Sequence, residues 1–203
     1  MPLLLASTLP KATLDYGLLA AGLTGGWLGD IILMCEDSRS DDPAVRTRNL
    51  VRGSMAVAVN QLAYQAIFIR SGARVTLRNA SPRALLVLAG TGLALLRNRA
   101  ALPAAGCYGS ALALTSILAQ DFSQKAGIGA GLFVLSDSLI LARMLLLKDG
   151  SRIDALASAS VMATYKAAQL LIVDAITRQL NKNSAQPLTK LPNSTNLTTT
   201  VSG

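Results

Sequence analysis

The stretch Gly127–Leu147, GIGAGLFVLSDSLILARMLLL, decides the fold class. It is apolar over most of its length, and about 20 residues of α-helix span the hydrocarbon core of a bilayer. Inside it lies Asp137, and an ionisable group at that depth costs at least about 2.5 kcal/mol. Such a residue normally faces the interior of a helix bundle, which makes Asp137 a candidate functional residue. The alternative is an aspartate that only caps or bonds to a neighbouring helix.

The composition extends this interpretation to the whole chain. The 203 residues are 51% hydrophobic and only 15% charged, whereas about a quarter of a soluble domain is charged. The charges cluster between long apolar runs, and β-barrel strands would instead alternate in short segments. We therefore predict an all-α fold, a polytopic transmembrane helix bundle of about six to seven spans. The protein should be a multi-pass integral membrane protein, in a bacterial cell membrane.

Charge and residue usage exclude several function classes. The net charge of +8 is explained by basic loop residues beside anionic lipid headgroups. Aromatic residues make up 4% of the chain, too few to stack bases, so we expect the bilayer and no nucleic acid as a partner. Histidine is absent, which excludes His-assisted nucleophiles and His-ligated metal sites. Cys35 and Cys107 lack CxxC spacing. We expect no metal and no cofactor, and the oligomeric state stays open.

The other apolar runs give the remaining spans. They are Tyr16–Met34, Gly53–Ile69, Ala84–Leu96, Ala100–Leu118 and Ile153–Ile176. Hydrophilic loops are expected over 35–52 and 70–83. We expect one transmembrane domain over residues 1–176. Residues 177–203 are rich in Asn, Ser, Thr and Pro and should form a disordered polar tail.

Glycines recur within two of the expected spans. Gly22 and Gly26, like Gly25 and Gly29, form GxxxG pairs, which allow close helix approach in lipid. Gly127, Gly129 and Gly131 form GxGxG, but no strand precedes them, so we interpret them as packing residues and not as a nucleotide loop.

Polar residues also occur within the spans. Asp30 is a second intramembrane carboxylate, close to the end of its span. Asn60 with Tyr64, and Gln61 with Gln65, are spaced i and i+4 and so share helix faces. That span either lines a polar cavity or bonds to neighbouring helices, and both interpretations stay open.

The two carboxyl groups suggest acid chemistry. A carboxyl group in a low dielectric favours its protonated form, which is a usable general acid. A second, ionised carboxylate could stabilise developing positive charge, as in glycosidases acting on acetals. Vinyl ethers hydrolyse through a similar oxocarbenium ion, formed by protonating the alkene carbon. A membrane site with Asp30 and Asp137 could therefore cleave an acid-labile ether.

Four short stretches carry a resemblance to a known family. They are GDIIL at 29–33, Gly53 with Tyr64, FVLSD at 133–137 and TYKAAQLLI at 164–172. In this order they resemble the GDxxL, GxxxFxxxHxxY, F-[LIV]-x-S-D and TYxxxQxLI motifs of the YhhN/lysoplasmalogenase family of membrane proteins. The resemblance covers the chain from Met1 to about Ile176.

This resemblance implies an all-helical bundle and, as in some members, hydrolysis of the vinyl ether of lysoplasmalogens to a fatty aldehyde and a glycerophospho-alcohol. The partner would be a membrane lipid substrate. We expect Asp137, flanked by Leu135 and Leu139, to donate the proton. Asp30, nearer a charged loop, would be its ionised catalytic partner. The expected substrate-binding residues are Asn60, Tyr64, Tyr108, Ser136, Tyr165 and Gln169.

The chain departs from the family pattern in three places. Gln61 stands where the family often has histidine, so a proton shuttle there is lost. Lys166 lies within the TYxxxQ motif, and it either faces the cavity, snorkels to the membrane surface or pairs with Asp174. Met1–Leu5 resembles the middle of a KPL-like segment that members usually carry after a further span, so we expect the chain to start late.

Two other functions stay open at this point. Buried Asp, Tyr, Gln and Lys residues also suit the translocation path of a small-solute or proton-coupled transporter. Internal repeats would favour a transporter, and the sequence shows no convincing one. A non-catalytic membrane protein is the other alternative.

Overall fold

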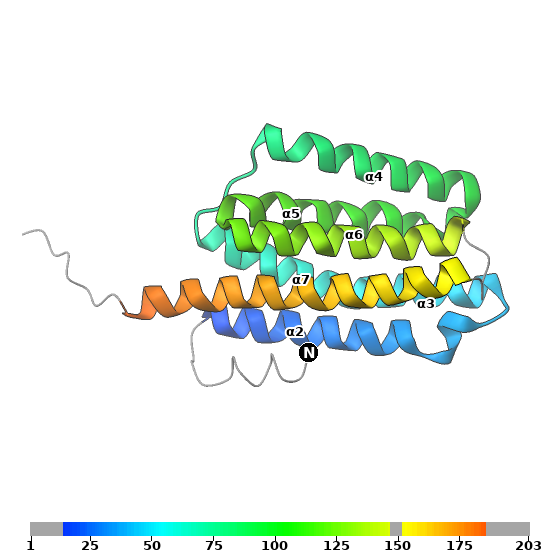
Figure 1. Cartoon of the computed structure of the whole chain (residues 1–203), viewed down its shortest axis with the longest axis horizontal. Coiled ribbons are helices and arrows are strands. Elements are labelled where there is room, and N and C mark those ends of the chain that lie inside the picture. Colours follow the sequence, from blue (N-terminus) through cyan, green and yellow to red (C-terminus); the bar gives the residue numbers. More distant parts are fainter. Residues whose placement is uncertain (1–13, 147–151, 186–203) are drawn as a thin grey trace, which may run out of the picture.

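The protein is a bundle of long helices that lie side by side (Figure 1). The computed structural model describes residues 14–146 and 152–185. The helices in this part of the chain are α2 (Leu14–Met34), α3 (Pro43–Arg70), α4 (Leu77–Arg97), α5 (Gly109–Phe122), α6 (Gln124–Leu146) and α7 (Arg152–Ala185). Short turns η1 (Glu36–Arg39), η2 (Arg99–Ala101) and η3 (Pro103–Tyr108) lie in the connections. The described residues form helices and turns without a strand, which confirms the all-α prediction.

Five helical segments are long and apolar enough to cross a membrane. They are Leu14–Met34, Leu77–Arg97, Arg99–Phe122, Gln124–Arg143 and Ala155–Lys182. The 28-residue α3 is long enough but less apolar, because arginine and amide side chains interrupt it. It packs against α2, α5 and the η turns, so its polar face is turned toward other helices. The predicted multi-pass bundle is confirmed, with a polar helix inside it.

Two expected loops are shorter than the sequence analysis predicted. α3 begins at Pro43 and not at Gly53. The Asp42 side chain accepts a hydrogen bond from the Ala44 amide at 2.8 Å, and proline suits the first helical position, so this start is well capped. α4 begins at Leu77 and extends the expected short span Ala84–Leu96 to 21 residues. Both helices begin with polar side chains in their first turns, so the apolar runs in the sequence did not indicate where the helices start.

The end of the bundle also differs from the expected domain boundary. α7 continues past Ile176 to Ala185, so the first part of the expected tail is helical. The remaining tail, residues 186–203, lies outside the described residues, as does the N-terminal run Met1–Leu9.

Glycine positions let α2 and α3 approach closely. A Cβ atom added at Gly25 would lie 2.8 Å from the Val59 Cβ and 3.0 Å from the Ala56 carbonyl oxygen. One added at Gly22 would lie 2.7 Å from the Ala63 Cβ. These distances are shorter than carbon atoms tolerate, so the two helices need glycine along this seam, as the sequence predicts.

A glycine also allows α6 and α7 to approach closely. A Cβ atom added at Gly129 would lie 2.9 Å from the Ile172 Cγ1 and 3.0 Å from the Ala168 carbonyl oxygen. Gly131, by contrast, has no neighbouring atom within 4 Å on that side. The GxGxG stretch is therefore a helix-packing segment at Gly129.

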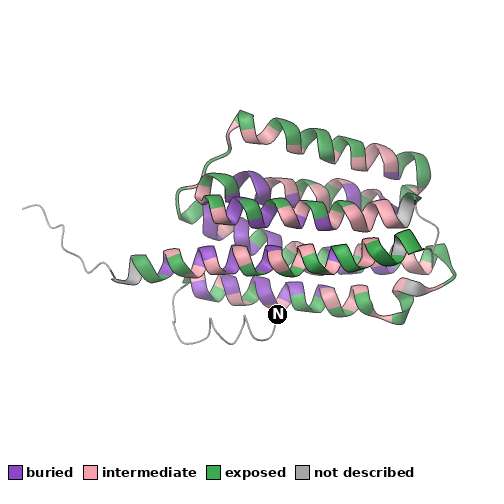
Figure 2. Ribbon diagram, viewed as in Figure 1, coloured by how far each residue is buried: buried purple, intermediate pink, exposed green. Residues whose placement is uncertain are grey.

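Burial is concentrated where the other helices face one another, and α4 contributes little to it (Figure 2). Within α4 only Ala94 is buried, and Leu85 and Leu88 are about two-thirds exposed, at 68% and 67%. In a membrane these leucines contact lipid. α4 is thus a peripheral span that packs on α5 and α6.

We expect Gly25→Leu to destabilise the bundle by about 1–3 kcal/mol, because the added side chain must push α3 away. Gly17→Leu is the matched control on the same helix, since nothing lies within 4 Å of a Cβ there. It should change the free energy of unfolding by less than about 0.5 kcal/mol. Unfolding in mixed micelles measures both. Equal effects of the two variants would show that the α2–α3 seam is not tightly packed.

Candidate functional site

Asp137 lies half-buried in α6, and its partner comes from the preceding span. The Tyr108 hydroxyl donates a hydrogen bond to the Asp137 carboxylate oxygen Oδ2. Both residues are located away from the helix ends that carry the loop charges. This contact gives the deep carboxyl group a specific partner, as an ionisable group in a membrane requires.

A π-helical turn sets the position of Tyr108. Tyr108 is the last residue of η3, a π-helical turn that begins at Pro103. π turns are rare and frequently occur at functional sites. The turn was not predicted from the sequence. Its one local signal is a proline inside an apolar span, because proline lacks the amide hydrogen that a regular helix ladder needs.

Asp30 reaches the same region from α2. Its carboxyl group lies close enough to the Tyr165 hydroxyl of α7 to interact with it. Asp30 and Asp137 are close enough to interact electrostatically with each other, and both interact with Tyr108. The structure therefore brings together two carboxyl groups and two tyrosines from four different elements.

Buried amides connect this centre to α3. The Tyr64 hydroxyl donates to the Gln169 Oε1. The Gln169 Nε2 in turn donates to the Asn60 Oδ1 at 3.3 Å and lies 3.5 Å from the Tyr165 hydroxyl. Asn60 and Tyr64 are fully buried, and Gln169 is 2% exposed. A continuous polar network thus runs from α3 through α7 to Asp30.

Ser136 has a different place from the other expected binding residues. Its hydroxyl is fully buried and donates to the Val161 carbonyl oxygen at 3.2 Å, which ties α6 to α7. One turn earlier, the Phe133 ring packs edge-on against the Tyr165 ring, with centroids 5.3 Å apart. The two residues hold the α6–α7 pair in the register that presents Asp137 and Tyr165.

Gln61, like Gln65 on the same helix face, is a buried polar residue that the expected binding set omitted. It is fully buried, and neither its Oε1 nor its Nε2 has a hydrogen-bond partner among the described residues. Leaving a buried polar group unsatisfied costs about 1–3 kcal/mol. Its place at the histidine position of the family motif is the signal that could have identified it.

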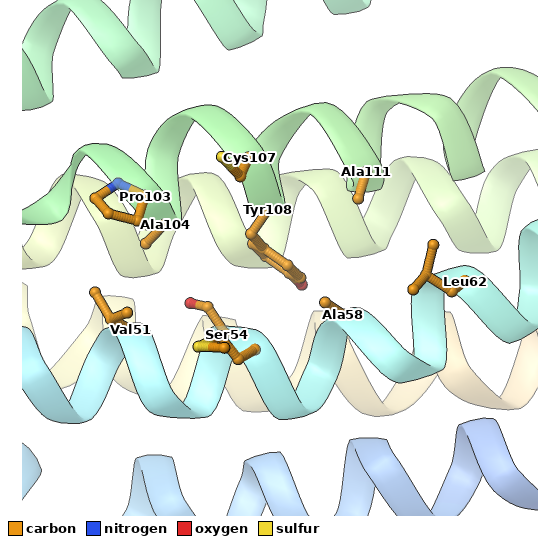
Figure 3. Close-up of a pocket in the computed structure, with 10 residues that line it drawn as sticks. Val51, Ser54, Ala58, Leu62, Pro103, Ala104, Cys107, Tyr108 and Ala111 are labelled. Atoms are coloured by element: carbon orange, nitrogen blue, oxygen red, sulfur yellow. The ribbon is translucent and has the colours of Figure 1, made fainter.

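An apolar cavity of about 320 Å³ lies between α3 and the η3–α5 segment. Figure 3 shows its two walls, with Ser54 and Ala58 on α3 facing Ala104 and Tyr108 on the other side. The Tyr108 ring projects between the walls. Because Tyr108 also bonds to Asp137, the cavity and the polar network share a residue.

Comparison with known families identifies the chain. The model of the YhhN family matches residues 1–176. The chain belongs to the YhhN family. Searches of curated proteins and of solved structures each gave no match.

The residues of the YhhN motifs contact one another across helices. Leu33 of the first motif packs on Gly53, where an added Cβ would lie 2.5 Å from the leucine side chain. Tyr64 of the second motif bonds to Gln169 of the fourth, and Phe133 of the third packs on Tyr165. Residues from motifs that are far apart in the sequence therefore pack against one another in the bundle.

Lys166 lies on the exposed side of α7, although it follows Tyr165 directly. Asp174 pairs with Lys125 and, at 2.8 Å, with Arg178, so the expected pair with Lys166 is replaced by one with these two residues. Over residues 14–146 and 152–185, no three Cys, Asp or Glu side chains gather as a metal site would require. The polar centre of this chain is built from hydroxyl, amide and carboxyl groups.

Tyr64→Phe should destabilise the protein by about 1–3 kcal/mol, because it leaves the Gln169 Oε1 buried without a donor. Gln169→Leu should have a similar effect. In the double variant neither half of the pair is left unsatisfied. Its loss of unfolding free energy should therefore be smaller than the sum of the two single losses by about 0.5–3 kcal/mol. Unfolding in mixed micelles measures the cycle, and strictly additive effects would contradict the pairing.

Proposed function

We propose that this YhhN-family protein is a lysoplasmalogenase-like hydrolase that cleaves the vinyl ether bond of alkenyl-glycerophospholipids. The observation that supports this most is the Tyr108–Asp137 hydrogen bond, with Asp30 within electrostatic range, inside a membrane-spanning bundle. Family membership supports the substrate class. The products would be a fatty aldehyde and a glycerophospho-alcohol.

The first chemical step is proton transfer to carbon. Protonated Asp137 gives its proton to the outer alkene carbon, and the ether oxygen lone pair forms the oxocarbenium ion. Tyr108 holds the other oxygen of the carboxyl group, which fixes the acid in place during the transfer. Positioned proton transfer contributes about 10²–10⁴ in rate.

The second step consumes one water molecule. Water adds to the oxocarbenium carbon and gives a proton back to the Asp137 carboxylate, which yields a hemiacetal and restores the acid. Collapse of the hemiacetal releases the aldehyde and returns the glycerol oxygen as a hydroxyl group. The Asp30 carboxylate, which lies close to Tyr165, supplies the counter-charge for the cation between these two events.

The two aspartates take different roles because their positions differ. Asp137 lies between Leu135 and Leu139 in the interior of α6, which continues to Leu146. Asp30 lies in the last part of α2, close to the polar connection that precedes α3. Two nearby negative charges in a low dielectric repel each other, so we infer that one proton resides on the pair, on Asp137.

Asp137→Asn keeps the shape of the side chain and removes the transferable proton, so aldehyde release from a lysoplasmalogen should fall by about 10²–10⁴. Asp30→Asn should also lower it, because the cation loses its counter-charge. Asp41→Asn, on the exposed connection before α3, is the control and should keep the wild-type rate. The measurement is aldehyde release in liposomes at equal protein levels.

Near wild-type rates for both Asn variants would rule out the carboxylate mechanism. If the wild-type protein itself releases no aldehyde from any lysoplasmalogen, the enzyme proposal fails. A transport assay with proteoliposomes would then be the next measurement.

A further inference from the structure

The cavity between α3 and the η3–α5 segment has the lining of a hydrocarbon site. Its walls are made mostly of alanine, leucine, valine, methionine and proline side chains. The polar exceptions are the Ser54 hydroxyl, the Cys107 thiol and the Tyr108 hydroxyl. At about 320 Å³ it reaches the size of small-molecule pockets, which start at about 300 Å³.

The cavity borders the lipid-facing surface. On α3 its rim includes Met55 and Leu62, which are 69% and 59% exposed, and on the other wall Cys107 is exposed. In a membrane-spanning bundle such apolar exposed side chains face acyl chains. A lipid chain could therefore enter sideways from the bilayer without crossing water.

The inner side of the cavity meets polar groups. Tyr108 lines it and bonds to Asp137. Gln61 lies on the same side of α3 as the lining residues Ser54 and Ala58, seven and three positions before it. Neither polar atom of its amide has a hydrogen-bond partner in the described part of the chain. The apolar space thus borders Tyr108, the partner of the Asp137 carboxyl group, which matches a molecule with a hydrocarbon tail and an oxygen-bearing end.

We propose that this cavity binds the single hydrocarbon chain of the ether lipid and thereby places its first carbons beside Tyr108 and Asp137. The inference rests on the proposed function and adds where the chain lies. A hydrocarbon chain in this cavity places the vinyl ether beside Asp137. The cavity therefore sets the position of cleavage and the preferred chain length.

Cys107 offers a test that needs no turnover. In a Cys35→Ser background, a small uncharged maleimide should modify Cys107 in lipid nanodiscs. A saturated 1-O-alkyl lysophospholipid, which has no alkene to protonate, should slow this modification at least about fivefold, because its chain covers the thiol. Added diacyl phospholipid should not. Mass spectrometry of the protein gives both rates.

Two results would overturn the proposal in this test. One is a modification rate that the alkyl lysolipid does not change. The other is equal protection by the diacyl lipid, which would make the cavity an ordinary site for bilayer lipid. Neither result depends on catalysis, so they are distinguishable from a failure of the proposed hydrolase activity.

Chain-length selectivity provides the second test. Ala58→Leu and Ala111→Leu add bulk inside the cavity, whereas Ala84→Leu adds the same bulk on the exposed face of α4. The ratio of kcat/KM for an octadecenyl over a hexenyl lysoplasmalogen should fall at least about tenfold in the cavity variants, as overpacking implies. It should stay unchanged in Ala84→Leu. An unchanged ratio in the cavity variants would place the chain elsewhere.

Discussion

Two carboxyl groups inside a membrane-spanning bundle have to be kept away from hydrocarbon, and much of this structure follows from that constraint. Asp137 accepts a hydrogen bond from Tyr108, and Asp30 lies close to Tyr165. The tyrosines are supported in turn by ring packing and by the buried amides of the network. α3, which is too polar to be exposed to lipid over its length, is stable here because its amide side chains face other helices.

Close helix packing is what makes this polar centre compact. Glycines along α2 and at Gly129 let the backbones of paired helices approach within distances that a Cβ atom would forbid. The polar side chains from α2, α3 and α7 therefore reach one another directly. The same bundle leaves an apolar cavity beside Tyr108, so an acid and a hydrocarbon site adjoin. An amphiphile with a cleavable bond at its polar end fits this pairing.

The sequence predicted the class of fold and the main polar residues, because their energetic cost in lipid is large. An intramembrane Asp30 or Asp137 has to turn inward, and the i, i+4 spacing of Tyr165 and Gln169 has to place them on one face. Other features depend on tertiary contacts. The π turn at Tyr108 and the early starts of α3 and α4 leave weak local signals. The use of Ser136 as a tie to Val161, and the unpaired amide of Gln61, appear only once neighbouring helices are placed.

The central claim is that a carboxyl group of this protein protonates the alkene carbon of a vinyl ether. The most direct measurement is mass spectrometry of the products when the wild-type protein acts on a lysoplasmalogen in deuterated water. The account predicts one deuterium on the carbon next to the aldehyde carbonyl. In ¹⁸O-labelled water, it predicts no label in the glycerophospho-alcohol. An aldehyde without deuterium at that carbon, or ¹⁸O in the glycerophospho-alcohol, would contradict it.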